Sequence, residues 1–351
     1  MADAQTRGRA VYHQITARKR LVLGGLTALL VVTVALDLGT GPSSLTAIEV
    51  LQAIVAPSSI DAGRLSIVWD IRLPMALMAV VVGASLSVAG AEMQTILDNP
   101  LASPFTLGVS AAAGFGAALA LVFGFSIVPG AGMLLLAGNA FVFAMLAALA
   151  IHACSLLRGV TAETMVLLGI ALVFLFNSLL ALLQYVASEQ ALQQVVFWTL
   201  GSLGRASWSK LAVTTAVLVT VLPLLARGAW QLTMFRLGDE RARSLGVNVR
   251  ALRLRVLLGV SLLAATPVAF VGTIGFVGLV GPHVARMLLG EDQRYFLPGS
   301  ALAGALLLSA TSLVSKCVIP GVIVPIGIIT SLVGVPFFLA LIFTRRRQLW
   351  S

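Results

Sequence analysis

The sequence alternates between long apolar runs without charge and short stretches in which charged and polar residues gather. Runs of about 20 mostly apolar residues are typical of membrane-spanning helices. One run, residues 99–157, contains no Asp, Glu, Lys or Arg and would be about 88 Å long as a single helix. We therefore expect it to fold back at Ser126–Gly132, where Pro129 interrupts the pattern. The expected spans are 21–36, 73–97, 105–125, 132–157, 163–187, 208–227, two helices joined near Gly272 within 256–285, 295–316 and 323–344.

The composition agrees with this pattern. Hydrophobic residues make up 59% of the 351 residues and charged residues only 10%, whereas a soluble domain carries about 25% charged residues. The apolar runs also lack the alternation of apolar and polar residues that strands of a transmembrane barrel show. The sequence therefore predicts an all-α polytopic membrane protein with about ten transmembrane helices, and it excludes an ordinary soluble enzyme.

Basic residues predict the orientation. The formal net charge is +10, and 23 residues are Lys or Arg. With ten spans and both termini in the cytoplasm, all but five of these lie on the cytoplasmic side, in agreement with the positive-inside rule. We expect a basic cytoplasmic N-terminal segment at 1–20, one ten-helix transmembrane domain at 21–345 and a cytoplasmic tail at 346–351. The five basic residues expected outside are Arg64, Arg72, Arg205, Lys210 and Lys316.

The most charged stretch, 236–255, lies on the expected cytoplasmic side. Acidic residues precede basic ones in it, an order that suits the dipole of a short helix. Gly246 suits a left-handed cap at the end of that helix, and Ala242 and Leu245 are three residues apart, on one face. A short amphipathic helix that needs a packing partner is one interpretation, and a solvated loop is the other. The segment consists of Leu237, Gly238, Asp239, Glu240, Arg241, Ala242, Arg243, Ser244, Leu245 and Gly246.

Three polar residues at the inner half of the second span are candidates for a translocation path or gate. Glu92 is a lone carboxyl within the span, where ionisable groups are costly and often functional. Contact with a transported substrate and a hydrogen bond to a neighbour such as Gln94 are both open. Asn99 precedes Pro100 and is expected to stop the helix, with a gate as the alternative role.

Chemistry beyond transport has little support in the sequence. The three histidines and two cysteines lack the spacing of metal ligands, and the spans hold no evident pair of nucleophile and base. We therefore expect no catalytic residue and no metal site. The chain also shows no Walker A pattern, so any ATP hydrolysis would have to come from another subunit.

Several motifs, in order along the chain, resemble one family of membrane proteins. The segment 237–246 follows the pattern Leu-Gly-x-x-x-Ala-x-x-Leu-Gly, and every fixed position matches. The chain is similar over about residues 70–345 to FecCD-type permeases, the membrane subunits of ABC importers for ferric siderophores, haem and cobalamin. Further matching blocks are Arg72-Leu-Pro74, Asn99-Pro-Leu-Ala102, Leu107-Gly-Val-Ser110, Gly201-Ser-Leu203, Gly275-Phe-Val-Gly-Leu-Val280, Pro325-Ile-Gly327 and Gly334-x-Pro336.

The resemblance implies a type II ABC importer permease fold in the bacterial inner membrane. It implies a dimer with a second permease subunit, two ABC ATPase subunits that use ATP and Mg, and a periplasmic or lipid-anchored substrate-binding protein. The chain itself would bind no cofactor and no nucleic acid. Residues 236–250 would form the cytoplasmic coupling segment for the ATPase. Arg72 and Lys316 would meet the binding protein, although Met75 stands where the family often has a second arginine.

The resemblance leaves the substrate open. We expect a ferric siderophore, with haem or cobalamin as alternatives, and either a homodimer or a heterodimer. An ion-coupled secondary transporter is a different reading, and it would need buried acidic residues or broken helices at the membrane midplane. Glu92 is the one candidate for such an acid. An intramembrane enzyme is a third reading, for which the expected spans supply no catalytic group.

Overall fold

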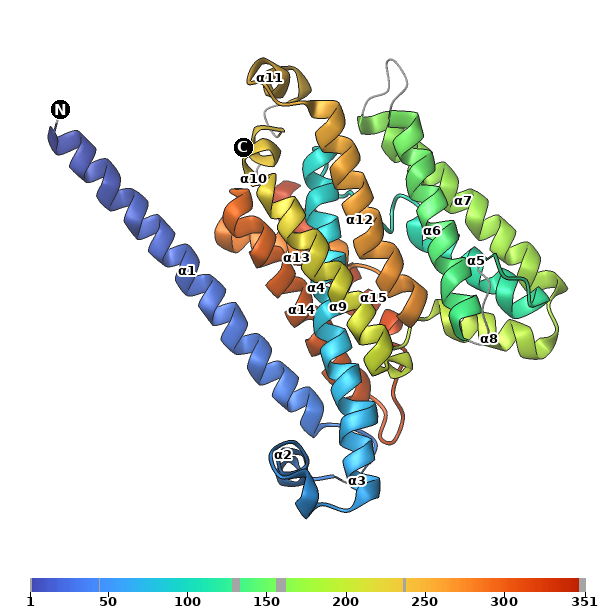
Figure 1. Ribbon diagram of the computed structural model, residues 1–351. Helices are drawn as coiled ribbons and strands as arrows, with labels where there is room; N and C mark the ends of the chain where they lie inside the picture. The colour runs from blue at the N-terminus through green and yellow to red at the C-terminus, as the bar shows by residue number, and fades with distance from the viewer. Residues whose placement is uncertain (1, 44, 128–132, 156–161, 236–237, 347–351) are drawn as a thin grey trace.

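The computed structural model describes residues 2–43, 45–127, 133–155, 162–235 and 238–346. This part of the chain is nearly all helical (Figure 1). Seven of its helices are long and apolar enough to cross a membrane, and three shorter apolar helices bring the number to the expected ten. The predicted all-α class is confirmed. The spans are α1 (Ala2–Gly39), α4 (Leu73–Ile96), α5 (Val109–Phe123), α6 (Met133–Ser155), α7 (Ala162–Val186), α9 (Trp208–Arg227), α12 (Val249–Val271), α13 (Val277–Leu289), α14 (Gln293–Cys317) and α15 (Ile326–Arg346).

The predicted spans agree with these helices to within about four residues at each end, except that α1 and α12 begin well before their expected starts at residues 21 and 256. The helix α1 runs through the expected boundary at residue 20 without a break. The polar stretch 188–207 contains α8 (Glu189–Thr199), which was not among the expected helices. Ser188 caps it by accepting a hydrogen bond from the backbone N–H of Ala191.

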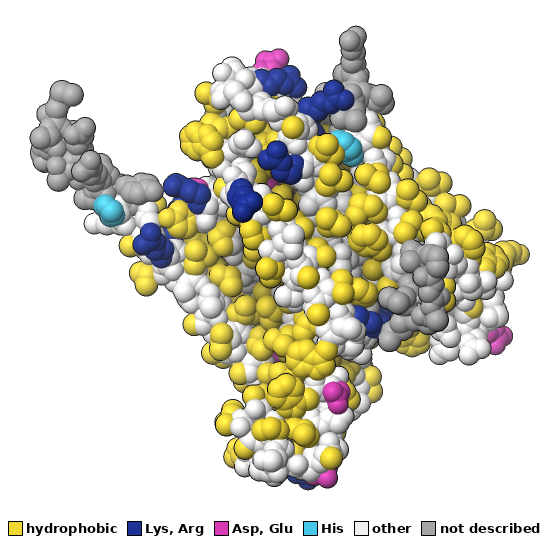
Figure 2. Space-filling view, in the orientation of Figure 1, with side chains coloured by type: hydrophobic (Ala, Val, Ile, Leu, Met, Phe, Trp, Pro, Cys, Tyr) yellow, Lys and Arg dark blue, Asp and Glu magenta, His cyan; other side chains and the backbone are white. Residues whose placement is uncertain are grey.

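The two ends of the bundle differ in charge. The N-terminal end of α1 lies at the same end as α10 (Ala229–Phe235) and α11 (Asp239–Ser244). The small helices α2 (Ala47–Val55) and α3 (Ala62–Ser66) lie at the opposite end (Figure 1). On the face shown in Figure 2, most Lys and Arg side chains gather toward the end with α10 and α11. The positive-inside rule therefore assigns that end to the cytoplasm.

The helix α4 occupies the centre of the molecule and is buried along almost its whole length. It packs against α12, α13 and α14. Glycines allow its backbone to approach theirs, because a Cβ on Gly83 would overlap the carbonyl of Gly304, and a Cβ on Gly90 would overlap that of Gly278. Such small-residue contacts are the usual basis of close helix packing in membranes.

The helices α5 and α13 are short, and each begins after a non-helical stretch of chain. The residue before α5, Gly108, has a φ of 82°, and the residue before α13, Phe276, has a φ of 66°. The predicted break near Gly272 is confirmed, since α12 ends at Val271 and α13 begins at Val277. A left-handed conformation is uncommon for a bulky residue such as Phe276.

Candidate functional site

The loop between α9 and α12 forms a compact projection at the cytoplasmic end. Its two small helices, α10 and α11, lie against each other, and α11 also contacts α12. Gly246 has a φ of 83°. Its N–H donates to the carbonyl of Arg243 (3.0 Å), and the N–H of Val247 donates to that of Ala242 (3.0 Å). These two hydrogen bonds together form a Schellman motif. The predicted left-handed cap at Gly246 is therefore confirmed.

The side chains of α11 divide between the protein and the solvent. Ala242 is fully buried, whereas Leu245 is 58% exposed. The two were expected on one face, but α11 ends at Ser244, and Leu245 follows as its cap residue. Ala242 therefore holds α11 on the bundle, and Leu245 remains available to a partner. Glu240, Arg241, Arg243 and Ser244 are exposed, Leu237 lies outside the described residues, and the side chain of Asp239 is not described.

The two basic residues expected to meet a binding protein are buried in the outer end of the bundle. The guanidinium of Arg72 donates to the carbonyl of Leu38 (2.8 Å) and to the hydroxyl of Ser43 (2.8 Å). The ammonium of Lys316 lies 2.9 Å from the Asp37 carboxylate. Neither charge faces solvent, so the expected rim contacts are not formed by these side chains in this conformation. Their docking role stays a prediction.

Asp37 is a residue that the sequence analysis did not single out. It lies in the last turn of α1, and its partner Lys316 lies in the last turn of α14. The ammonium also donates to the backbone carbonyl of Asp37 (3.0 Å). A sequence signal was present, because one acidic residue ends the first span and one basic residue ends the ninth. Only the fold shows that these two ends meet.

The candidate path residues lie at the inner end of α4, in different surroundings. Glu92 is fully buried, and neither carboxylate oxygen has a hydrogen-bond partner among the described residues. Gln94 accepts a hydrogen bond from the guanidinium of Arg286 on α13 (2.9 Å), and Arg286 also pairs with Glu291 (3.5 Å). The side chain of Asn99 accepts from the N–H of Leu101 (2.9 Å), in the turn that follows α4.

A second polar contact, between α4 and α14, involves the residue next to Gln94. The side-chain amide of Gln293 donates to the hydroxyl of Thr95 (2.9 Å). Just before it, Asp292 caps α14, and the hydrogen bond from the Arg294 side chain holds the pKa of that carboxyl below its usual range. Arg286, Gln293 and Thr95 were not predicted as site residues. Gln293 lies 198 positions after Thr95, and Arg286 lies 192 positions after Gln94, so the sequence gave no signal that these residues meet.

No group of three or more His, Cys, Asp and Glu residues in the described parts of the chain could hold a metal ion. Cys154 is half-buried and Cys317 is exposed, and both are free thiols. The ring of His283 packs edge-on against Phe337, with centroids 5.8 Å apart.

Comparison with known proteins identifies the family. The model of the FecCD transport family matches residues 29–344. The chain belongs to the FecCD family. It is 38% identical to the hemin transport system permease HmuU of Yersinia pestis, over 94% of this chain and 97% of that protein. It is 34% identical to the molybdate import system permease MolB of Haemophilus influenzae, over 93% and 96% of the two chains.

A cobalamin transporter and a solved structure extend the comparison. The FecCD permease described here is 34% identical to the vitamin B12 import system permease BtuC of Vibrio vulnificus, over 93% of this chain and 96% of that one. A solved structure, described as an inward-facing transporter of metal-chelate type, matches with a TM-score of 0.81 and 32% identity, over 93% and 99% of the two chains. The FecCD permease is thus a multi-pass membrane subunit of an ABC transporter.

Proposed function

We propose that this FecCD permease is the membrane-spanning subunit of a binding-protein-dependent importer that carries a ferric siderophore across the bacterial inner membrane. The family membership supports an importer permease. A pair of permease subunits, either identical or related, would enclose the path, and two ATPase subunits would drive it. The chain would bind no cofactor itself, because the partner ATPase uses the ATP and Mg.

The geometry of α11 is the observation that supports the proposed contact with the ATPase. The helix is held on the bundle by the buried Ala242 and closed at its end by Gly246. Glu240, Arg241, Arg243 and Leu245 are exposed to solvent at the basic end of the molecule. A short helix fixed on one side and exposed on the other can be pushed as a unit. Closure of an ATPase bound to α11 would thus move α12, which α11 contacts.

An iron chelate is the substrate class that we propose, and haem and cobalamin are the alternatives. A metal-chelate type transporter is among the similar structures, and a hemin permease and a cobalamin permease are among the relatives. A binding protein outside would supply affinity, and it would dock over the end that holds α2 and α3. Arg72 and Lys316 belong to this end, where their pairings hold the outer segments together.

Uptake in reconstituted vesicles tests the proposal. The permease is assembled with its cognate ATPase and binding protein, and uptake of radiolabelled ferric siderophores, haem, cobalamin and molybdate is measured. We expect ATP-dependent uptake of one ferric siderophore. Uptake of haem, cobalamin or molybdate alone would replace the substrate and keep the class of transporter. Uptake that persisted without the ATPase but stopped when the ion gradient was removed would establish an ion-coupled transporter instead.

A further inference from the structure

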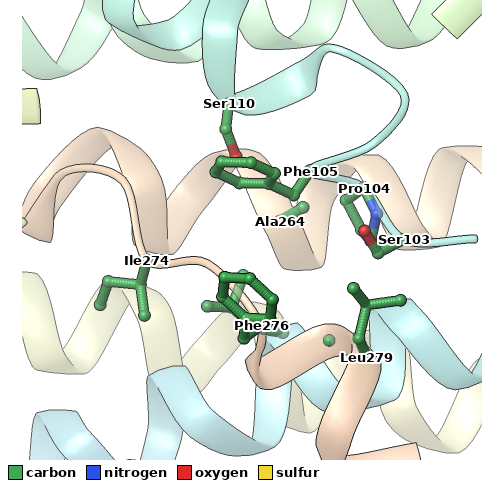
Figure 3. A pocket seen from close by; sticks show the side chains of 10 residues that line it. Ser103, Pro104, Phe105, Ser110, Ala264, Ile274, Phe276 and Leu279 are labelled. Atoms are coloured by element: carbon green, nitrogen blue, oxygen red, sulfur yellow. The ribbon is translucent and has the colours of Figure 1, made fainter. Parts of the chain in front are cut away.

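Apolar side chains are closely packed inside the bundle but not on the small outer helix α2. The pocket where α5 and α13 begin, which Phe105 and Phe276 line (Figure 3), has a cavity volume of about 10 Å³, enough for about one water molecule. On α2, by contrast, Ile48, Leu51 and Val55 are 69%, 62% and 74% exposed. Because these three residues are spaced by three and four positions, they share one face of the helix.

The opposite face of α2 packs against the protein. Val50 and Ala53 are buried there, in a small apolar cluster with Val68, which belongs to the helical segment just before α4. Thr46 and Glu49 form a capping box at the start of α2, which fixes its N-terminus. The helix is therefore held in place by one apolar face and presents a second one outward, and such a face favours contact with another apolar surface.

Two tryptophans place α2 at the outer edge of the membrane. The indole N–H of Trp208, the first residue of the span α9, donates to the backbone carbonyl of Trp69 (2.9 Å). The indole N–H of Trp69 donates in turn to the carbonyl of Ala53 in α2 (2.9 Å). Both rings are exposed, and exposed tryptophans are enriched where a membrane meets water. The level of α2 is therefore tied to the outer end of a span.

The length of the central helix agrees with this level. The helical stretch Ala62–Ile96 is continuous, and Trp69 precedes its inner end by 27 residues, or about 40 Å. This is the thickness of a bilayer together with its headgroup regions, so Trp69 falls in the outer headgroup region when Ile96 lies in the inner one. Figure 1 shows α2 nearly end-on, crosswise to the long helices, as expected for a helix that lies along the membrane surface.

The start of α2 also adjoins the outward surface of α1. A Cβ on Gly39, the last residue of α1, would lie 4.0 Å from the Cβ of Ala47, the first residue of α2. One turn earlier in α1, Leu36 is 55% exposed on the outside of the span, so the lipid that covers it borders α2. The charge of Glu49 is paired with Arg64, and the rest of α2 is uncharged.

We propose that α2 lies in the outer-leaflet interface and anchors the outer loop there, with Ile48, Leu51 and Val55 among phospholipid acyl chains. The partner is thus a phospholipid, held through its acyl chains and not through the charge of its headgroup. Interfacial helices of this kind insert their apolar face by about 5–10 Å. The anchor leaves the remainder of the outer end to a binding protein. This inference goes beyond the transport function and does not depend on the substrate.

Spin labels on the full-length permease in phosphatidylcholine nanodiscs test the anchor. Cys154 and Cys317 are replaced by alanine, and one cysteine is then introduced by Leu51→Cys or by Ser58→Cys and labelled with a nitroxide. Ser58 is the matched control, because it is exposed in the turn after α2. Power saturation measures collisions of each label with oxygen, which concentrates in lipid, and with a nickel chelate, which stays in water.

We expect the label at position 51 to collide more with oxygen and less with the nickel chelate than the label at position 58. Its depth should be about 5–10 Å below the lipid headgroups. The depth should not change when part of the phosphatidylcholine is replaced by anionic phosphatidylglycerol, because apolar contact and not charge holds the helix.

A binding protein is the competing occupant of this face, and the same labels distinguish it from lipid. Equal nickel collision at positions 51 and 58 in the permease alone would overturn the anchor. Protection of position 51 that appeared only after the binding protein was added would assign the face to that protein instead. ATP-driven uptake by the labelled variants, assembled with the ATPase and binding protein, is measured in parallel. Intact uptake with position 51 in water would refute the anchor and leave the transport function standing.

Discussion

Lys316 and Asp37 form a buried ion pair between the last turns of α14 and α1, with 2.9 Å between the ammonium nitrogen and the carboxylate oxygen. Their side chains are 2% and 1% exposed. Arg72 lies close by in the fold and donates to the carbonyl of Leu38, the next residue after Asp37. The pair thus joins the first helix to the ninth span at the outer end of the bundle.

Breaking this pair on one side should destabilise the protein strongly. Lys316→Met leaves a buried carboxylate without its cation, and Asp37→Asn leaves a buried ammonium without its anion. Loss of one partner of a buried pair costs about 3–5 kcal/mol of unfolding free energy. The double variant should recover a large part of the loss, since it buries no unpaired charge. Thermal unfolding of the purified variants in detergent measures all three, and additive losses would contradict the coupling.

A charged residue at position 245 should separate the permease from its ATPase without unfolding it. Leu245 is 58% exposed, so Leu245→Glu places the new carboxylate in water and removes an apolar contact from the partner surface. We expect the ATPase to be lost from pull-downs and uptake to fall, while the unfolding temperature stays unchanged. Leu245→Met is the matched control. Normal ATPase recovery with Leu245→Glu would remove α11 from the docking surface.

A glutamate at position 242, three residues earlier, should lower the stability of the permease. Ala242 is fully buried where α11 lies on the bundle, so Ala242→Glu forces a charge and extra volume into a closed site. The expected result is a lower unfolding temperature, with ATPase recovery falling in proportion to the folded fraction. A fully stable Ala242→Glu variant that failed only to bind the ATPase would mean that Ala242 faces the partner.

Glycine contacts along α4 should be intolerant of a single methyl group. A Cβ on Gly90 would overlap the backbone of Gly278, whereas a Cβ on Gly24 in α1 would meet nothing within 4 Å. We expect Gly90→Ala to cost about 1–3 kcal/mol, the usual range for overpacking. Gly24→Ala should be neutral. Unfolding of the two variants side by side separates packing from any general effect of alanine, and equal stability would refute the close contact.

Glu92 should tolerate conversion to an amide. The carboxylate has no described hydrogen-bond partner, so Glu92→Gln breaks no contact while keeping nearly the same volume. We expect unchanged stability and an unchanged dependence of uptake on pH. Uptake that lost its pH dependence in Glu92→Gln would instead assign proton transfer to this residue and favour an ion-coupled transporter. A parallel Glu92→Ala variant should be less stable, because it leaves a cavity.

The sequence predicted the helices better than it predicted their contacts. Charge-free runs located the ten spans because a bilayer requires uninterrupted apolar helices, and 208–227 agrees with α9 at both ends. The helix α8 was missed because its residues are mostly polar. The capping serine at 188 was its one local signal.

Contacts between distant segments explain most of what remained unpredicted. Arg72 and Lys316 lie at the outward ends of spans and were expected, by resemblance, to meet a binding protein, but Lys316 pairs with a residue 279 positions earlier in the chain. The shared face of Ala242 and Leu245 assumed one continuous helix, and the chain leaves the helix between them.

The short lengths of α5 and α13 affect how the protein is made. With 15 and 13 residues they are about 22 Å and 20 Å long, against a hydrocarbon core of about 30 Å. Neither can settle in lipid alone, because the non-helical chain before each would expose backbone polar groups. The helix α13 packs on both α4 and α14, so it gains its full set of contacts only after the ninth span has been made. A nascent chain released before the ninth span should therefore be a substrate for membrane proteases.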